Sequence, residues 1–387
     1  MGKKKILFKI SYLGIGGIER LAIDILNNLK FEDKEFVLML ENEENNIMQD
    51  QLDKSIEIVY LKPKWFNPLA EKIRSKKKNI LYKILYNLIM PLDKILLAKG
   101  INNYIKNNKN IDMFVDYNGE AGKYIHKIKA KKKVMWNHLS ISNKSKDKLK
   151  RFGERLKNYD IIVTICDEMK EELEKEFPFL KEKLKRIYNF IDIEKINEKL
   201  LEEISEQDKK LMEENYCISV GRLAEPKDYE TTIKAFELLR KKGIEEKLYI
   251  IGDGVKKEEL NELIREKGLE NQILLLGQKN NPYIWMKNAD IFIHSSKLEG
   301  FGLVLVEGMV CNLPIISSNY KCGAKEILEN GKIGELFEIG EFEDLASRIE
   351  KLLKNENKRK EYIENSKKII MEFSKEKILE EYRKIFL

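Results

Sequence analysis

Short apolar runs recur along the whole chain, and most are followed by a turn and then by a segment with helical spacing of apolar residues. Runs of this length that are rich in β-branched and aromatic residues predict buried strands. Their alternation with helices predicts βαβ units, and therefore parallel sheets covered by helices. We expect strands at 4–11, 35–40, 56–61, 111–117, 133–137, 160–165, 216–220, 248–251, 273–276, 289–293 and 314–317.

The runs form two arrays, separated by an acidic segment at 194–214. A length of 387 residues suits two domains of ordinary size. We therefore expect an α/β fold with two Rossmann-like parallel-sheet domains, at 1–192 and 193–373, facing each other across a cleft. Asp228 and Ser374 are good N-cap residues, and they predict the starts of a helix through Arg240 and of the last helix, 374–386.

Composition excludes several classes of protein. No apolar run reaches the ~20 residues that span a bilayer, and the N-terminal basic residues lead straight into a strand without a signal-peptide pattern. The four cysteines have no C-x-x-C spacing, so neither a disulfide framework nor a zinc site is indicated. A dinucleotide fingerprint, G-x-G-x-x-G with an acidic residue ~20 positions on, is absent, which argues against an NAD enzyme. We expect a cytoplasmic protein.

The stretch 295–326 carries the strongest chemical pattern. A strand leads into Glu299-Gly300-Phe301-Gly302, and a helical apolar run begins at Leu303. Glycines let the backbone approach a bound group closely, and the N–H groups at a helix start form an anion site. Glu307 lies about one turn inside the helix, so both carboxylates would face one cleft, where sugar or ribose hydroxyls suit them. The alternative is a purely geometric turn with a glutamate that complements the helix dipole.

Other strands also end in turns that suit an anionic ligand. Arg222 and Lys227 lie five residues apart after one strand, and together they offer a planar fork and a point charge for phosphate oxygens. The alternative is that both are ordinary surface residues with solvated side chains. His138 follows a strand at the same predicted edge, whereas His126 and His294 are interpreted as structural. The remaining glycine turns of this kind contain Gly16 and Gly17, Gly252 with Asp253, and Gly277.

These motifs together resemble the retaining family-4 glycosyltransferases of the GT-B fold. The resemblance rests on E-G-F-G-L-V-L-V-E at 299–307, P-I-I-S at 314–317 with Gly323 and Glu326, and G-G-x-E-R at 16–20. G-R-L at 221–223 followed by Lys227, and a hinge-like 188–192, add to it. It implies transfer of a hexose from a nucleoside-diphosphate sugar, UDP-linked, with retention of configuration. It also implies bacterial surface glycan assembly of the capsule, lipopolysaccharide or teichoic acid type, and a C-terminal helix, 374–387, that crosses back to the first domain.

The resemblance also assigns roles. Glu307 would hold the ribose and Glu299 the donor sugar, while Arg222 and Lys227 would stabilise the leaving diphosphate. No side chain is placed as a nucleophile and no Asp-x-Asp motif is present, so the reaction is expected to need neither metal nor cofactor. Asn312 and Cys322 depart from the family pattern, which leaves the sugar open. The implied catalytic residues are Arg222, Lys227, Glu299 and His138; donor contacts would add Gly16, Gly17, Gly252, Asp253, Gly277, Gly300, Phe301, Gly302, Leu303 and Glu307.

The segment 62–157 is strongly basic, with 25 lysines and arginines against 7 aspartates and glutamates. Within it, 71–108 is apolar-periodic and contains Pro91, which is expected to break or kink the helix. A basic amphipathic helix suggests a peripheral site on the inner face of the membrane, near a glycan or lipid-linked acceptor. The alternative is a helix packed on the sheet, with solvated lysines. A nucleotide-sugar epimerase or phosphorylase, or a non-enzymatic protein that binds nucleic acid or an anionic surface, are the other functions considered; RNA- and DNA-binding motifs are absent.

Overall fold

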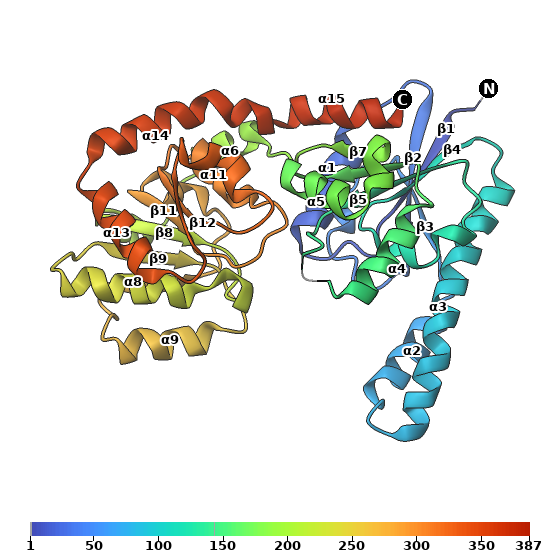
Figure 1. Ribbon diagram of the computed structural model, residues 1–387, viewed down its shortest axis with the longest axis horizontal. Helices are drawn as coiled ribbons and strands as arrows, with labels where there is room; N and C mark the ends of the chain where they lie inside the picture. Colours follow the sequence, from blue (N-terminus) through green and yellow to red (C-terminus); the bar gives the residue numbers. More distant parts are fainter. Residues whose placement is uncertain (1, 143) are drawn as a thin grey trace. The chain divides into compact units, whose positions relative to one another are not determined.

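A computed structural model describes residues 2–142 and 144–387 of the chain. By its internal contacts the chain divides into two compact units. Unit 1 runs to Ile165 and also contains Met169–Ile187 and Leu379–Leu387, while unit 2 contains Cys166–Glu168 and Tyr188–Ile378. Each unit is built on one parallel sheet with flanking helices (Figure 1). The predicted α/β architecture with two Rossmann-like sheets is therefore confirmed.

Unit 1 has a seven-stranded sheet in the order β3-β2-β1-β4-β5-β6-β7. All its neighbouring strands pair in parallel, and the apolar side chains of the central strand, Ile6, Leu7 and Phe8, are fully buried. The chain order reverses between β1 and β4, where α/β sheets of this kind usually bind ligands. The strands are β1 Lys4–Lys9, β2 Lys34–Leu40, β3 Glu57–Tyr60, β4 Ile111–Asp116, β5 Lys132–Asn137, β6 Ile161–Thr164 and β7 Leu184–Arg186.

Two helices of unit 1 run side by side and extend away from the sheet (Figure 1). The longer one, α3, passes through Pro91 without interruption, so Pro91 does not break the helix, which was one of the two expected effects. A proline costs a helix about 3 kcal/mol, and packing of the neighbouring helix around buried Phe66, Ile73 and Ile89 offsets it. The helices of this unit are α1 Gly17–Asn28, α2 Phe66–Ser75, α3 Ile80–Asn107, α4 Lys146–Leu156 and, from Met169 on, α5 Asp167–Glu176.

One apolar face of α3 is not packed on the sheet. Leu81 and Leu88 are 66% and 65% exposed, and Leu85 is 45% exposed. The opposite face, with Leu97 and Ile101, is the buried one. The expected period is therefore present, but this stripe faces away from the core of unit 1. No helix in the described ranges is both long and apolar enough to cross a membrane.

Unit 2 has a six-stranded parallel sheet in the order β10-β9-β8-β11-β12-β13. Its strand order reverses between β8 and β11. The edge strand of this sheet, β13, and the edge strand of the unit 1 sheet, β7, have three residues each and were not expected from the sequence. The strands are β8 Tyr216–Val220, β9 Lys247–Ile251, β10 Ile273–Gly277, β11 Ile291–His294, β12 Ile315–Ser318 and β13 Glu335–Phe337; the helices are α6 Ile193–Lys199, α7 Glu206–Met212, α8 Tyr229–Lys241, α9 Lys257–Glu266, α10 Tyr283–Lys287, α11 Leu303–Val310, α12 Ala324–Ile327, α13 Phe342–Leu353 and α14 Glu356–Ile369.

The end of the chain returns to unit 1. Helix α15, Lys375–Phe386, begins after Ser374, whose hydroxyl accepts a hydrogen bond from the Lys377 N–H at 3.4 Å. Within unit 1 the ring of Tyr382 stacks on Trp136 at 5.2 Å, and Phe386 packs on Phe36. The last nine residues thus complete the core of the first sheet.

Candidate functional site

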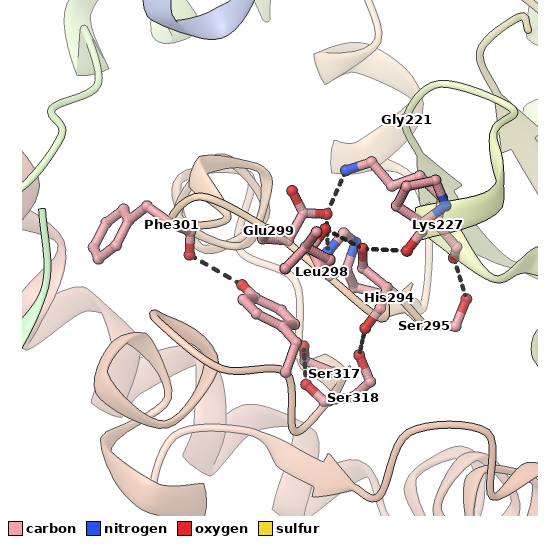
Figure 2. A network of polar contacts seen from close by, with 12 residues as sticks. Gly221, Lys227, His294, Ser295, Leu298, Glu299, Phe301, Ser317 and Ser318 are labelled. Atoms are coloured by element: carbon pink, nitrogen blue, oxygen red, sulfur yellow. Dashed lines mark hydrogen bonds and ion pairs between the residues drawn. The ribbon is translucent and has the colours of Figure 1, made fainter. Parts of the chain in front are cut away.

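The site in unit 2 is built where β8 and β11 end. The short 3₁₀ turn Glu225–Lys227 follows β8, and the loop after β11 is bonded to it. The hydroxyls of Ser295 and Ser296 donate to the carbonyl oxygens of Lys227 and Pro226, at 3.0 and 2.8 Å. These bonds hold Lys227 beside the glycine-rich turn that precedes α11 (Figure 2).

A lysine, a histidine and a glutamate meet in this site. Lys227 Nζ lies 2.5 Å from Glu299 Oε1, and His294 Nε2 lies 3.0 Å from the same oxygen. Figure 2 shows both contacts converging there. Among the described residues, the other oxygen of Glu299 accepts no hydrogen bond. The site therefore keeps one carboxylate oxygen available for a ligand.

The electrostatics of the cluster favour an ionised carboxylate. Burial alone would raise the pKa of Glu299, but His294 and Lys227 lower it to about 2. Burial lowers the pKa of His294, although Glu299 opposes this. His294 is therefore uncharged at neutral pH and holds Glu299 through its Nε2–H, while Lys227 supplies the positive charge.

The glycine turn needs glycine for steric reasons. Gly302 has φ 94°, and a Cβ there would lie 1.9 Å from the Tyr320 hydroxyl. That hydroxyl donates to the Phe301 carbonyl at 3.1 Å. Gly302 is the N-cap of α11, and its carbonyl accepts from the Leu305 N–H at 2.9 Å, so the N–H groups of Leu303 and Val304 are the ones without an intrahelical acceptor. The ring of Phe301 is buried against Tyr188, so only its backbone is positioned to meet a ligand.

Glu307 and Arg222 differ in how they are held. Glu307 is half-buried on α11, and its Oε1 accepts a hydrogen bond from the Tyr283 hydroxyl at 3.3 Å. Arg222 is exposed just after β8, and its guanidinium makes no hydrogen bond or ion pair within the described part of the chain. The structure thus pairs Lys227 with Glu299 but leaves Arg222 uncommitted.

Of the other predicted glycines of unit 2, Gly252 is explained by close packing of strand ends and Gly277 by its φ of 71°. Gly252 has φ 149°, and a Cβ there would lie 1.9 Å from the Gly221 carbonyl oxygen. Its N–H donates to the Gly277 carbonyl at 2.9 Å. Asp253 is exposed, and its Oδ1 accepts from the Gly254 N–H at 2.8 Å.

The remaining predicted residues belong to unit 1. His138 is buried, and its Nε2–H donates to the Tyr117 carbonyl at 2.8 Å. Burial lowers the pKa of His138 to about 4, so the ring is neutral, and its Nδ1 is buried with no partner among the described residues. Gly16 is the N-cap of α1, and the space around the Gly17 Cβ position is open.

Two sequence interpretations need correction or extension. Asp228 does precede α8, but its φ of 49° turns the side chain away from the helix N–H groups, and it accepts instead from the Thr231 hydroxyl and from Lys297. His294 was interpreted as structural, yet it binds Glu299. Its position at a strand end, five residues before Glu299, was the available signal. No group of three possible metal-ligating side chains occurs in the described ranges.

Comparison with solved structures places the fold in a class. The chain aligns with HepE of Anabaena, whose structure is in complex with UDP and glucose, at a TM-score of 0.73 and 20% identity over 99% of both chains. The two parallel-sheet units are those of the GT-B fold.

Sequence relatives then define the family. A family described as "Glycosyl transferases group 1" matches residues 201–369. An uncharacterised glycosyltransferase of Methanocaldococcus jannaschii is 34% identical over 281 residues, 67% of this chain and 69% of that protein. The N-acetylgalactosamine-N,N'-diacetylbacillosaminyl-diphospho-undecaprenol 4-alpha-N-acetylgalactosaminyltransferase of Campylobacter jejuni is 34% identical over 228 residues, 59% of this chain and 60% of that protein's length. The chain belongs to the group 1 glycosyltransferases.

Proposed function

We propose that this glycosyltransferase moves a hexose from a UDP-linked donor to an acceptor hydroxyl, with retention of configuration. The observation that carries the proposal is the carboxylate of Glu299 beside the start of α11. One of its oxygens is bonded to Lys227 and His294, and the other is available to a ligand. A buried carboxylate with one open oxygen suits a sugar hydroxyl. Lys227 and the helix N–H groups suit the diphosphate next to it.

The two charged partners would separate when the donor binds. Lys227 would turn from Glu299 to the diphosphate oxygens, and Glu299 would stay in place through the His294 N–H. Arg222, which has no partner in the described residues, would add a second cation. Negative charge grows on the leaving diphosphate, and preorganised cations stabilise it. In a direct same-face displacement the leaving phosphate would accept the acceptor's proton, so no protein nucleophile and no metal is required.

Other residues would bind the rest of the donor. Glu307, already bonded to Tyr283, would accept the ribose hydroxyls. Gly252, Asp253 and Gly277 would shape the nucleotide side through their backbone. In unit 1, His138 would offer its unpartnered Nδ1 to a donor-sugar hydroxyl, and the open position at Gly17, beside Gly16, would let backbone approach the diphosphate.

The acceptor proposed is a glycan or a lipid-linked glycan in bacterial surface glycan assembly, such as a capsule, lipopolysaccharide or teichoic acid. The Campylobacter relative is named for a diphospho-undecaprenol acceptor. The exposed stripe of α3 with Lys76, Lys77, Lys78 and Lys83 nearby suits an anionic membrane surface. The protein would then act in the cytoplasm, at the inner face of the membrane.

A nucleotide-sugar panel tests the donor proposal. We expect thermal stabilisation by UDP and by one UDP-hexose, since a ligand at 100 times its Kd adds about 2.7 kcal/mol. Slow hydrolysis of that donor, measured by UDP release, should accompany it. An epimerised nucleotide sugar, or sugar phosphate formed with added phosphate, would instead indicate an epimerase or a phosphorylase. Failure of every nucleotide sugar and of UDP to bind would contradict the proposal.

Vesicle binding tests the membrane proposal. We expect the protein to sediment with anionic phosphatidylglycerol vesicles at low salt. Replacing Lys76, Lys77 and Lys78 by Glu should weaken this strongly, because each lysine near an anionic surface contributes about 1 kcal/mol. The same triple change at Lys354, Lys358 and Lys360, in unit 2, is the control. If the wild-type protein stays in the supernatant, a soluble acceptor is favoured.

A further inference from the structure

A polar cavity lies wholly within unit 1, and the donor proposal makes no use of it. Its volume is about 560 Å³. The floor is formed where strands β2, β3 and β4 end, by Glu41, Lys62 and Glu120. The walls are α2 and α3, which contribute Ala70 and Tyr86 among others.

The floor is a fixed network of charges. Lys62 Nζ lies 2.8 Å from Glu41 Oε2 and 2.6 Å from Asp93 Oδ1, so it joins the sheet to α3. Buried Lys9 takes the other oxygen of Glu41 at 3.1 Å. Burial opposes ionisation, yet Lys9 and Lys62 hold the pKa of Glu41 below its usual value, and Glu41 and Asp93 raise that of Lys62. The floor is thus a fixed base whose lysines and carboxylates are paired with one another, so hydrogen bonds to a ligand would come from the rest of the lining.

The lining is balanced in charge and rich in hydrogen-bonding groups. Four cationic and five carboxylate side chains line the cavity, together with three asparagines and three aromatic rings. Such a balance gives no net attraction to a phosphate or another anion. Carboxylates, lysines and amides instead match the donors and acceptors of sugar hydroxyls, while Tyr86 and Phe66 offer apolar ring surface.

The cavity also adjoins the glycine loop proposed to approach the donor. Asn42 and Asn45, in its lining, belong to the loop after β2. That loop is bonded to the residues before Gly16: Asn46 Oδ1 accepts from the Leu13 N–H at 2.9 Å, and the Met48 N–H donates to the Leu13 carbonyl at 3.0 Å. On its other side the cavity borders α3, the helix with the exposed apolar stripe.

We infer that this cavity binds the neutral saccharide part of the acceptor and excludes its phosphate. The identification of this saccharide as the acceptor rests on the proposed function. Binding of a saccharide in the cavity can be tested independently of that function. Ala70 is half-buried on the cavity wall, whereas its neighbour Leu69 is 43% exposed and outside the lining. Ala70→Trp therefore fills the cavity, and Leu69→Trp adds the same ring to the same helix outside it.

The test is saturation-transfer NMR with the methyl glycosides of glucose, galactose, N-acetylglucosamine and N-acetylgalactosamine. We expect transfer to at least one glycoside, unchanged in Leu69→Trp and reduced fivefold or more in Ala70→Trp. Phosphorus NMR of added pyrophosphate should show no difference between the two variants. No transfer to any glycoside, equal transfer in Ala70→Trp, or pyrophosphate binding lost only in Ala70→Trp would overturn the inference.

Thermal stabilisation by UDP in the same samples separates this inference from the donor proposal. All three proteins should be stabilised equally, because the donor residues of unit 2 are unchanged. If UDP stabilises none of them, the proposed donor is wrong, and the glycoside signals still decide the saccharide site. Circular dichroism of Ala70→Trp establishes that the variant is folded.

Discussion

The two units each bury a lysine–carboxylate cluster at the carboxyl end of a parallel sheet, but the clusters are completed differently. In unit 1, Lys9 and Lys62 occupy both oxygens of Glu41, and Lys62 reaches Asp93 as well. In unit 2, Lys227 and His294 meet on a single oxygen of Glu299. A carboxylate with both oxygens bonded within the protein stabilises the fold. A carboxylate with one oxygen bonded keeps the other available to a ligand.

The largest expected effect breaks the completed network. Lys62→Met should destabilise unit 1 by about 3 kcal/mol, because it leaves the half-buried Asp93 without a cation and leaves Glu41 with Lys9 alone. Hydrogen exchange in β2 and β3 measures this unit separately. Lys64→Met is the matched control, since Lys64 is 83% exposed and pairs with Glu43; it should change exchange little. Equal protection in both variants would mean that the network contributes nothing to the fold.

The next effect concerns the cluster around Glu299. Lys227→Ala should leave the protein folded but lower turnover about a hundredfold, as expected for loss of a cation at the leaving group. Lys256→Ala is the control, because Lys256 lies in the same unit and pairs with Glu225 and Glu259. Near-normal turnover of Lys227→Ala would remove this lysine from the diphosphate site.

A smaller effect separates the two glutamates of the turn. Glu307→Ala should weaken binding of free UDP about tenfold, because the ribose would lose its acceptor. Glu299→Ala should leave UDP binding nearly unchanged and raise the KM for the UDP-hexose by a similar factor. Calorimetric titration with UDP and kinetics with the donor measure both. An equal loss of UDP binding in both variants contradicts the division of roles.

The last prediction is that removing metal ions does not change turnover. Turnover should be the same before and after dialysis against EDTA, because Lys227 and Arg222 would stabilise the leaving group without a metal. UDP release under both conditions measures this. Loss of turnover on chelation, restored by Mg²⁺ or Mn²⁺, would assign the leaving-group charge to a metal ion instead.

The comparison also explains which features the sequence could predict. The central strands and the 299–307 turn are contiguous motifs, so local patterns identify them. The three-residue edge strands β7 and β13 are too short to show a period. The role of His294 depends on where its ring points, and the passage of α3 through Pro91 depends on packing against α2. The cavity of unit 1 draws on residues from β-strand ends and two helices, from Glu41 to Tyr124, and no local pattern joins them.

The return of the chain end to unit 1 has a consequence for synthesis. Tyr382 stacks on Trp136, and Lys34 Nζ donates to the Leu387 carbonyl at 3.2 Å. The first sheet therefore lacks part of its core until residues 379–387 have left the ribosome, after all of unit 2 has been translated. During translation, the aromatic surface near Phe36 therefore remains exposed in the N-terminal half of the chain. Chaperone binding, or truncation near the C-terminus, should affect unit 1 most, although it is synthesised first.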